Sequence, residues 1–340
     1  LHLLYLGVKK LLLLSALLVS LGSFGQENND GVLVNQTSAG ELQEDLGLLR
    51  PYITCWGDSL TRGGGWTTLL GALSGMNVYN GGTGGEDART ILARQGGDVM
   101  LINNITIPAG TTPVLIADRD VDGGIDTALG HKVTPLLQGG AHFNPCFIGD
   151  VQGTLQWTGS GHSDLTGDWE FTRAEAGSEV VINRPTAIRT DFDINKNKPH
   201  LQVIFIGQNR GYNDIEELIK QHKYLIEHSQ AKHTVILGLS SGSAVLRADY
   251  ENAMRKEFGR FFISLREYLA APIYTTGRDA IVSCYGLDDA GLTPTQEDLN
   301  AISSGKVPQQ LLLDSVHYTS ATKTVIGNLI YKKCKDLKIF

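Results

Sequence analysis

Four runs of apolar residues mark the places where the chain is expected to form buried strands. Three are continuous: YITCW (Tyr52–Trp56), LQVIFIG (Leu201–Gly207) and HTVILGL (His233–Leu239). The fourth, MNVYN (Met76–Asn80), is stopped by a cluster of glycines. Strands that are covered on both faces need continuous apolar sequence, and parallel sheets are built from such strands. The pattern predicts a parallel sheet that takes strands from both halves of the chain.

Helical patterns occupy the stretches that follow these runs. The segment after the glycine cluster opens with Glu86 and Asp87, which suit the positive N-terminal end of a helix dipole. A helix over Asp214–Gln230 lies between two expected strands and completes a strand, helix, strand unit. One long helix is expected over Ala248–Leu269, where apolar residues at steps of three and four indicate core packing rather than a cofactor site. A last helix is expected over Ala321–Leu337.

The stretch from Gly97 to Pro199 has a different pattern. Short β-prone runs are separated there by Gly, Asp and Asn turns, with almost no helical periodicity. The runs are Pro113–Ile116, Thr154–Trp157, Trp169–Thr172 and Glu179–Ile182. We therefore expect an α/β protein whose core, residues 27–96 and 200–340, is interrupted by an inserted, mostly antiparallel β domain at residues 97–199.

The first residues have the features of a secretory signal. VKKLLLLSALLVSLGSFGQ (Val8–Gln26) combines two lysines, an apolar run of about twelve residues and small residues at its exit. The run is short for a membrane span, which needs about 20 apolar residues. The sequence predicts a signal peptide over residues 1–26, a secreted or periplasmic protein, and no stable membrane insertion after cleavage. A retained anchor is the alternative.

Composition and charge narrow the classes of partner. A chain of 340 residues with 41% hydrophobic residues can fill a large core. The formal net charge is -7 and there is no long basic block, so nucleic acid is not an expected partner. Small molecules or neutral glycans fit this charge better. Nothing in the sequence indicates an oligomeric state.

The four cysteines stand singly and form no Cys-x-x-Cys motif. They are Cys55, Cys146, Cys284 and Cys334. Each lies in or beside an apolar stretch, which favours buried free thiols. Because export would permit disulfides, a bridge between Cys284 and Cys334 is the alternative.

The first candidate for catalysis is Ser59, in the stretch WGDSLTRGGGW. An apolar strand precedes it and an amphipathic segment follows it. Such a turn from strand to helix exposes a nucleophilic oxygen beside backbone N–H groups that can stabilise negative charge. Since Asp and Ser are also ordinary N-cap residues, a capped helix without catalysis is the alternative when this motif is taken alone.

Of the nine histidines, only His317 has a carboxylate at short range in a helix-entry context. In LLLDSVHYTSATK, Asp314 precedes His317 by three positions. On a turn this spacing lets the carboxylate accept the Nδ1 proton and leaves Nε2 free to take a proton from serine. The alternative is a loop aspartate that caps a turn beside a solvated histidine.

Two further segments could supply N–H groups for the oxyanion of a tetrahedral intermediate. NGGTGGE (Asn80–Glu86) follows a strand and opens a helix, and Gly85 can present its N–H with no side chain in the way. Asn209, in FIGQNRG, lies just past an expected strand, at the edge where open sheets place their sites. The alternatives are a phosphate loop, which lacks its Gly-Lys-Ser/Thr here, and an ordinary turn asparagine.

In this order, GDSLT, NGGTGGE, GQN and DSVH resemble the four sequence blocks of the SGNH, or GDSL-type, hydrolase (esterase/lipase) superfamily. The resemblance covers Tyr52–Gln95 and the chain from Leu201 onward. It implies a flavodoxin-like, three-layer α/β/α core. The site residues that it implies are Ser59, Asp314 and His317 as the catalytic triad, with the Ser59 and Gly85 N–H groups and Asn209 as the oxyanion hole.

The resemblance implies a secreted serine esterase that needs no metal or cofactor. We expect it to hydrolyse carboxylic esters, and acetyl esters of a small molecule or polysaccharide in particular. A lipase or thioesterase, or a non-catalytic glycan-binding protein on a decayed hydrolase core, is the alternative. Many members have an aspartate after the asparagine of the third block, but Arg210 follows Asn209 here, so the support of that aspartate is missing. Three longer stretches, residues 79–97, 206–211 and 285–319, resemble a subgroup of SGNH proteins from bacterial and phage genomes. Members of this subgroup have a β-rich insertion at the same place.

One acidic segment has part of the spacing of a calcium loop. DRDVDGGID offers Asp118, Asp120 and Asp122 as candidate ligands. Leu129 stands where a bidentate glutamate would be expected, and the flanking residues resemble strands. An acidic hairpin turn is therefore the favoured interpretation, and no metal is expected.

Overall fold

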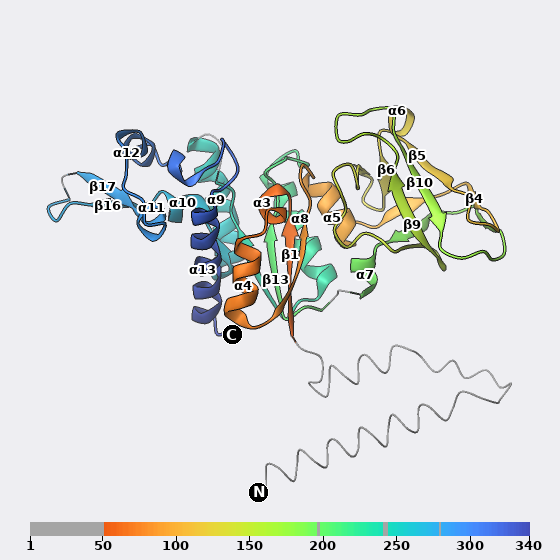
Figure 1. Ribbon diagram of the computed structural model, residues 1–340, viewed down its shortest axis with the longest axis horizontal. Coiled ribbons are helices and arrows are strands. Elements are labelled where there is room, and N and C mark those ends of the chain that lie inside the picture. Colours follow the sequence, from red (N-terminus) through yellow and green to blue (C-terminus); the bar gives the residue numbers. More distant parts are fainter. Residues whose placement is uncertain (1–50, 196–197, 241–243, 279) are drawn as a thin grey trace, which may run out of the picture. The chain divides into compact units, whose positions relative to one another are not determined.

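The computed structural model describes residues 51–195, 198–240, 244–278 and 280–340 (Figure 1). The predicted signal peptide at residues 1–26 lies outside the described residues.

A parallel sheet of five strands forms the centre of the α/β part. Its strands are β1 (Tyr52–Gly57), β2 (Asn77–Gly82), β13 (Leu201–Phe205), β14 (His233–Leu237) and β15 (Phe262–Ile263). They are ordered β15-β14-β13-β1-β2, and every neighbouring pair is parallel. The four apolar runs of the sequence all become strands of this sheet, so the predicted α/β class is confirmed.

Helices pack on both faces of the sheet because alternate strand residues point to opposite sides. On one face, Cys55 and Val203 share a core with helices α4 (Trp66–Ser74) and α13 (Ser320–Asp336). On the other face, Trp56 and Ile204 share a core with the remaining long helices. These are α5 (Ala88–Gln95), α8 (Ile215–Ser229) and α9 (Ala244–Phe258).

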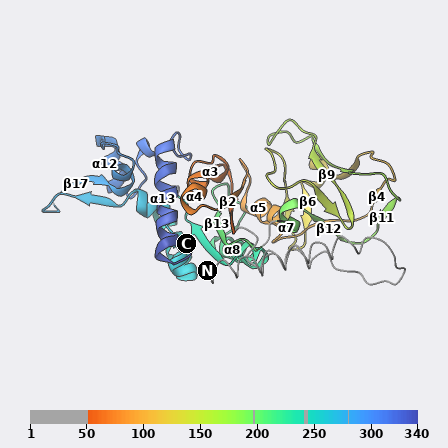
Figure 2. The same ribbon diagram turned by 60° about the horizontal axis from the view of Figure 1, so that its bottom comes forward.

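Helix α13 lies directly against α4, as both views show (Figures 1 and 2). A Cβ added at Gly327 would lie 2.9 Å from Leu69 Cδ2 and 3.2 Å from the Trp66 carbonyl oxygen, so the two helices pack closely at this glycine. The last helix of the chain is therefore fixed against the segment that follows Ser59.

The single long helix expected over 248–269 is wrong. Helix α9 ends at Phe258, and Gly259 has a φ of 52°, in the left-handed region that breaks a helix. A short 3₁₀ turn (Gly259–Phe261), strand β15 and helix α10 (Leu265–Leu269) follow. The apolar spacing runs across this break unchanged. The sequence pattern therefore did not predict β15, the fifth strand of the sheet.

Between β2 and β13 the chain forms antiparallel β-structure with its own apolar core. An eight-stranded sheet has the order β5-β10-β9-β8-β12-β3-β6-β7, and β4 pairs separately with β11. The strands are β3 (Met100–Ile102), β4 (Ile105–Ile107), β5 (Val114–Asp118), β6 (Ile125–Thr127), β7 (Lys132–Val133), β8 (Cys146–Ile148), β9 (Val151–Trp157), β10 (Asp168–Arg173), β11 (Val180–Ile182) and β12 (Thr186–Arg189). The four predicted β runs fall on β5, β9, β10 and β11, whereas the shorter strands had no signal of their own. The proposed boundaries at residues 97 and 199 stay a prediction.

The remaining elements are short. They are α3 (Ser59–Arg62), α6 (Arg119–Asp122), α7 (Asp191–Asn195), a hairpin of β16 (Pro272–Tyr274) and β17 (Ile281–Cys284), α11 (Tyr285–Asp289), α12 (Gln296–Ser303) and a 3₁₀ turn (Gln309–Leu311). All four cysteines are buried with free thiols, so the alternative of a Cys284–Cys334 disulfide is wrong. None of the helices in the described part of the chain is long and apolar enough to cross a membrane.

Candidate active site

Ser59 is the first residue of α3, directly after the carboxyl end of β1. Asp58 caps this helix, and its Oδ1 accepts the Leu60 N–H at 2.9 Å. The turn is tight: a Cβ added at Gly57 would lie 2.1 Å from Thr61 Oγ1, and one at Gly82 would lie 2.1 Å from the Arg62 nitrogen. The glycines therefore let β2 and α3 approach closely enough to fix the backbone that carries Ser59. Asp58 forms the N-cap expected from the sequence, and Ser59 is partly accessible at the same turn. The capped helix and the nucleophile therefore do not exclude each other.

His317 joins Ser59 to Asp314. Its Nε2 lies 2.9 Å from Ser59 Oγ, and its Nδ1 lies 2.7 Å from Asp314 Oδ2. Because the carboxylate accepts the Nδ1 proton, Nε2 has a free lone pair that accepts the serine hydroxyl. Two residues that are 258 positions apart in the chain are thereby in direct hydrogen-bond contact.

The loop that carries Asp314 and His317 is held by its own backbone. Asp314 Oδ1 accepts the N–H groups of Val316 and His317, each at 2.7 Å. These bonds and the His317 side chain lower the pKa of Asp314 to about 2, so its carboxylate is ionised at neutral pH. Next to the loop, the buried Tyr318 donates its hydroxyl to Ser240 Oγ at 2.6 Å, which ties this segment to the chain that follows β14.

Gly85 lies in the loop that connects β2 to α5 and has a φ of 74°, which favours glycine. The same loop is tied to the end of β1, because the Thr83 N–H donates to the Gly57 carbonyl at 3.1 Å. Among the described residues, neither the Ser59 N–H nor the Gly85 N–H donates a hydrogen bond to another group. Two backbone donors are thus available on adjoining loops.

Asn209 follows β13 and reaches the Gly85 loop. Its Nδ2 donates to the Glu86 carbonyl at 3.1 Å, and the Ala88 N–H donates to the Arg210 carbonyl at 3.0 Å. An amide nitrogen carries two protons, so one N–H of Asn209 remains for a ligand. The loops after β1, β2 and β13 therefore meet at the carboxyl edge of three neighbouring strands, where open parallel sheets bind their ligands.

A buried ion pair that the sequence did not reveal supports these loops. Arg94 is 0% exposed, and its Nη2 lies 2.7 Å from Glu86 Oε2 and donates to the Gly81 carbonyl at 2.6 Å. Its Nη1 donates to the Ala141 carbonyl at 2.9 Å. Burial raises the pKa of Glu86, and Arg94 opposes this shift. Glu86, expected only to favour a helix N-terminus, instead fixes the segment next to Gly85.

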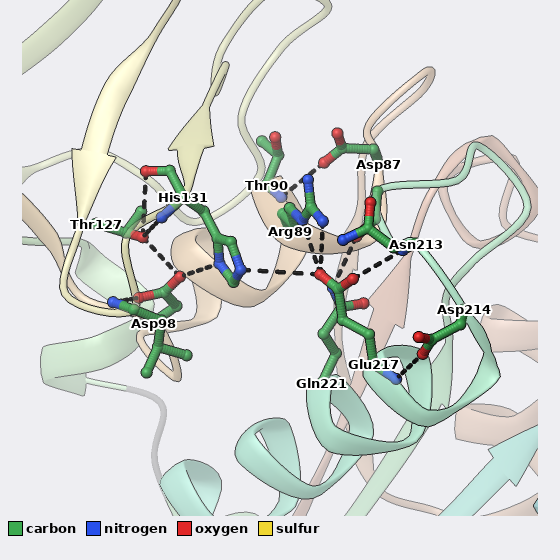
Figure 3. A network of polar contacts seen from close by, with 12 residues as sticks. Asp87, Arg89, Thr90, Asp98, Thr127, His131, Asn213, Asp214, Glu217 and Gln221 are labelled. Carbon is green, nitrogen blue, oxygen red and sulfur yellow. Dashed lines mark hydrogen bonds and ion pairs between the residues drawn. The ribbon is translucent and has the colours of Figure 1, made fainter.

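Two other Asp–His pairs have no place in this site. In Figure 3, His131 lies with its Nδ1 2.8 Å from Asp98 Oδ2 and its Nε2 3.8 Å from Glu217 Oε1. His228 Nε2 contacts Asp193 Oδ1 at 2.6 Å. Both carboxylates are distant in sequence, so neither pair could be recognised from the sequence. Among these Asp–His pairs of the described residues, His317 is the one whose imidazole nitrogen also contacts a serine hydroxyl, whereas the hydroxyl of Thr127 contacts the Asp98 carboxylate and not the His131 ring.

The network in Figure 3 connects the antiparallel β-structure to helices α5 and α8. Glu217 Oε1 accepts Arg89 Nη2 at 2.6 Å, and Glu217 Oε2 accepts the Asn213 N–H at 2.7 Å. Burial raises the pKa of Glu217, but these hydrogen bonds outweigh it and the net shift is downward. The network therefore joins His131 and Asp98 to Arg89 of α5 and Glu217 of α8 through hydrogen bonds and ion pairs.

The acidic segment considered for calcium forms the single helical turn α6 instead of a hairpin turn. Asp118 Oδ1 accepts the N–H groups of Asp120 and Val121, and Asp122 Oδ2 accepts the Asp118 N–H at 2.8 Å. These carboxylates therefore satisfy backbone donors. Across residues 51–195, 198–240, 244–278 and 280–340, no group of three or more His, Cys, Asp or Glu side chains is arranged to hold a metal ion.

Comparison with models of known protein families finds no match for this chain. A search of curated proteins finds no matching relative either.

Proposed function

We propose that the protein is a serine esterase that cleaves carboxylic esters through an acyl-enzyme. The observation that carries this proposal is the continuous hydrogen-bonded chain from Asp314 through His317 to Ser59. This arrangement supplies a nucleophile, a base and a group that orients the base, which are the three parts that acyl transfer by serine needs.

In the proposed reaction, Ser59 Oγ attacks the ester carbonyl carbon while His317 Nε2 takes the hydroxyl proton. The ionised Asp314 stabilises the imidazolium that forms. Collapse of the tetrahedral intermediate breaks the bond to the alcohol, which leaves with the proton from Nε2. A water molecule then gives a proton to Nε2 and attacks the acyl carbon. The bond from this carbon to Ser59 Oγ breaks, Nε2 returns the proton to Oγ, and the acid is released.

The negative charge of the intermediate needs donors that are already in position. The Ser59 and Gly85 N–H groups and the second N–H of Asn209 are the proposed oxyanion hole, since they lie on the three loops that meet at the sheet edge. Each such donor is worth about 3 to 4 kcal/mol of transition-state stabilisation.

The topology is consistent with the SGNH hydrolase superfamily. In order of appearance, the parallel strands are arranged 2-1-3-4-5, which is the flavodoxin-like order of doubly wound sheets. This order, together with helices on both faces, supports a flavodoxin-like SGNH core that is interrupted by a β-rich insertion.

The proposed substrate is an acetyl ester of a carbohydrate, and the proposed location is outside the cytoplasm, as the signal-like segment implies. A lipase or thioesterase would differ by preferring long acyl chains. A glycan-binding protein on a decayed core would bind acetylated glycans without turnover, but the intact hydrogen bonds of all three triad residues favour an enzyme.

Hydrolysis of p-nitrophenyl esters from acetate to octanoate tests this proposal. Ser59→Ala is expected to lower kcat for acetate more than about 10³-fold, with Ser303→Ala, an exposed serine on α12, as the matched control. Undiminished hydrolysis by the Ser59→Ala protein would disprove the mechanism. A rate that rises with chain length would favour the lipase.

A further inference from the structure

We propose that Arg62 and Gln138 form a subsite for a carboxylate on the alcohol part of the substrate, so that the esters cleaved are those of acidic sugars such as uronic acids. This inference rests on the proposed esterase function. Arg62 lies three positions after Ser59, and residues at this spacing lie on the same face of a helix.

The guanidinium of Arg62 lies against the loop that contains Gly85. A Cβ added at Gly84 would lie 3.3 Å from Arg62 Nη1 and 3.2 Å from Gln138 Oε1. A Cβ added at Gly85 would lie 2.8 Å from Gln138 Nε2. Both side chains therefore cover the proposed oxyanion loop, and a substrate held there would contact them.

Arg62 is positioned but not neutralised. Its Nη1 donates to the Gln138 carbonyl at 2.9 Å, which leaves most of its five N–H donors for a ligand. Five other arginines in the described part of the chain have acidic partners: Arg89, Arg94, Arg189, Arg255 and Arg266. Arg62 forms no ion pair with any described residue.

These two side chains line a pocket of about 300 Å³, at the small end of the range for small-molecule sites. The pocket also includes Asn80, Gly82, Thr83 and Ala141, and Arg62 is its only charged lining residue. A planar guanidinium binds a carboxylate through two parallel hydrogen bonds, and a side-chain amide can bind a neighbouring hydroxyl. The lining therefore fits one polar, acidic ring rather than an acyl chain.

The local charge supports an anionic ligand although the chain is acidic overall. Lys323 lies at the C-terminal end of α3, with Nζ 3.4 Å from the Gly63 carbonyl. The nearest acid of the loop, Glu86, is paired with Arg94. Because an acetyl group carries no second polar group, the carboxylate must belong to the alcohol part of the ester.

The test compares two esters that differ in one carboxylate: mono-O-acetylated methyl galacturonoside and mono-O-acetylated methyl galactoside. We expect the wild-type protein to have the higher kcat/KM for the galacturonoside. Arg62→Gln should lower this preference about 10- to 100-fold, the effect of losing hydrogen bonds between charged groups. Arg62→Lys keeps the positive charge but loses the paired N–H donors of the guanidinium, so it should lower the preference less than Arg62→Gln does. Lys323→Gln removes a positive charge that contacts Gly63 but does not line the pocket, and it should change the preference less than twofold.

Binding separates failure of this subsite from failure of the esterase. Sodium galacturonate and galactose are titrated into the Ser59→Ala protein and followed by NMR, which needs no turnover. Tighter binding of galacturonate that is lost in Ser59→Ala/Arg62→Gln supports the subsite even if p-nitrophenyl acetate is not hydrolysed. Equal binding of the two sugars, or an equal effect of Arg62→Gln on both esters, overturns the subsite and leaves the esterase proposal untouched.

Discussion

Asn209 and Glu86, which are 123 positions apart in the chain, are joined by one hydrogen bond of 3.1 Å from the side-chain amide to the backbone carbonyl. The carboxylate of the same Glu86 is held by Arg94 in the buried ion pair. Glu86 is therefore fixed by the buried Arg94, and it in turn positions two of the three proposed oxyanion donors, Gly85 and Asn209. The ion pair is expected to matter both for stability and for the geometry of the site.

Arg94→Met should lower the free energy of unfolding by about 3 to 5 kcal/mol, because it leaves a buried acid without its partner. The double variant Glu86→Gln/Arg94→Met should recover part of this loss, since no charge is then stranded. Urea denaturation at neutral pH measures both. A loss below about 1 kcal/mol in the single variant would contradict the structural role of the pair.

Asp314→Asn should lower kcat for p-nitrophenyl acetate by about 10²- to 10⁴-fold, because an amide cannot hold His317 in the tautomer that accepts the serine proton. Asp164→Asn is the matched control. Asp164 also accepts two backbone N–H groups that lower the pKa of its carboxyl, but it contacts no histidine. If the two variants lose the same activity, Asp314 has only a structural role.

Gly85→Ala should lower kcat/KM by about 10²-fold or more, since the new Cβ would lie 2.8 Å from Gln138 Nε2 and displace the oxyanion loop. Gly123→Ala is the control for backbone strain. Gly123 has a φ of 73°, against 74° at Gly85, and a Cβ there would meet no atom within 4 Å. Adding Gln138→Ala to Gly85→Ala should restore part of the activity on p-nitrophenyl acetate. No recovery would mean that the strain, and not the contact, is responsible.

Asp58 should make stability depend on pH in the opposite direction to a salt-bridged acid. Burial raises its pKa from 3.8 to about 6, and its Oδ2 is buried without a hydrogen-bond partner. The folded state therefore binds more protons than the unfolded state between these values, and the free energy of unfolding falls as the pH rises through this window. The full effect is about 3 kcal/mol.

Asp58→Asn keeps the acceptor for the Leu60 N–H but cannot titrate. The difference in unfolding free energy between the wild-type and Asp58→Asn proteins should therefore move in favour of the variant as the pH rises from about 4 to about 7. Urea denaturation at several pH values measures it. A difference that stays constant would show that Asp58 is not perturbed by burial.

The strands that carry the site could be predicted because each is a continuous apolar run with a chemical motif at its end. The residues 59, 314 and 317 were also predictable as a set, since the spacing of Asp314 and His317 is local. The contacts that were not predictable all depend on side chains meeting across the fold. Arg94 appeared as one polar position in a helix. Glu86 is only eight positions away, but the burial of Arg94 also depends on the carbonyls of Gly81 and Ala141, which the fold brings to its guanidinium.

The net charge and the proposed subsite point to different ligands. An overall charge of -7 favours neutral ligands, whereas Arg62 is held beside Gly84 without an acidic partner in the described structure. The net charge of the whole chain includes charged residues on surfaces that do not contact the substrate. In the proposed subsite the substrate would be selected by Arg62 rather than by the total charge of the chain.

The order of the triad along the chain has a consequence for biosynthesis. Ser59 is made early, but its base arrives 258 positions later, just before the helix that packs on α4. A growing polypeptide would therefore contain Ser59 without its base until α13 has been synthesised and has docked on α4. The proposed esterase activity would then report that the chain from Ser59 to α13 has folded.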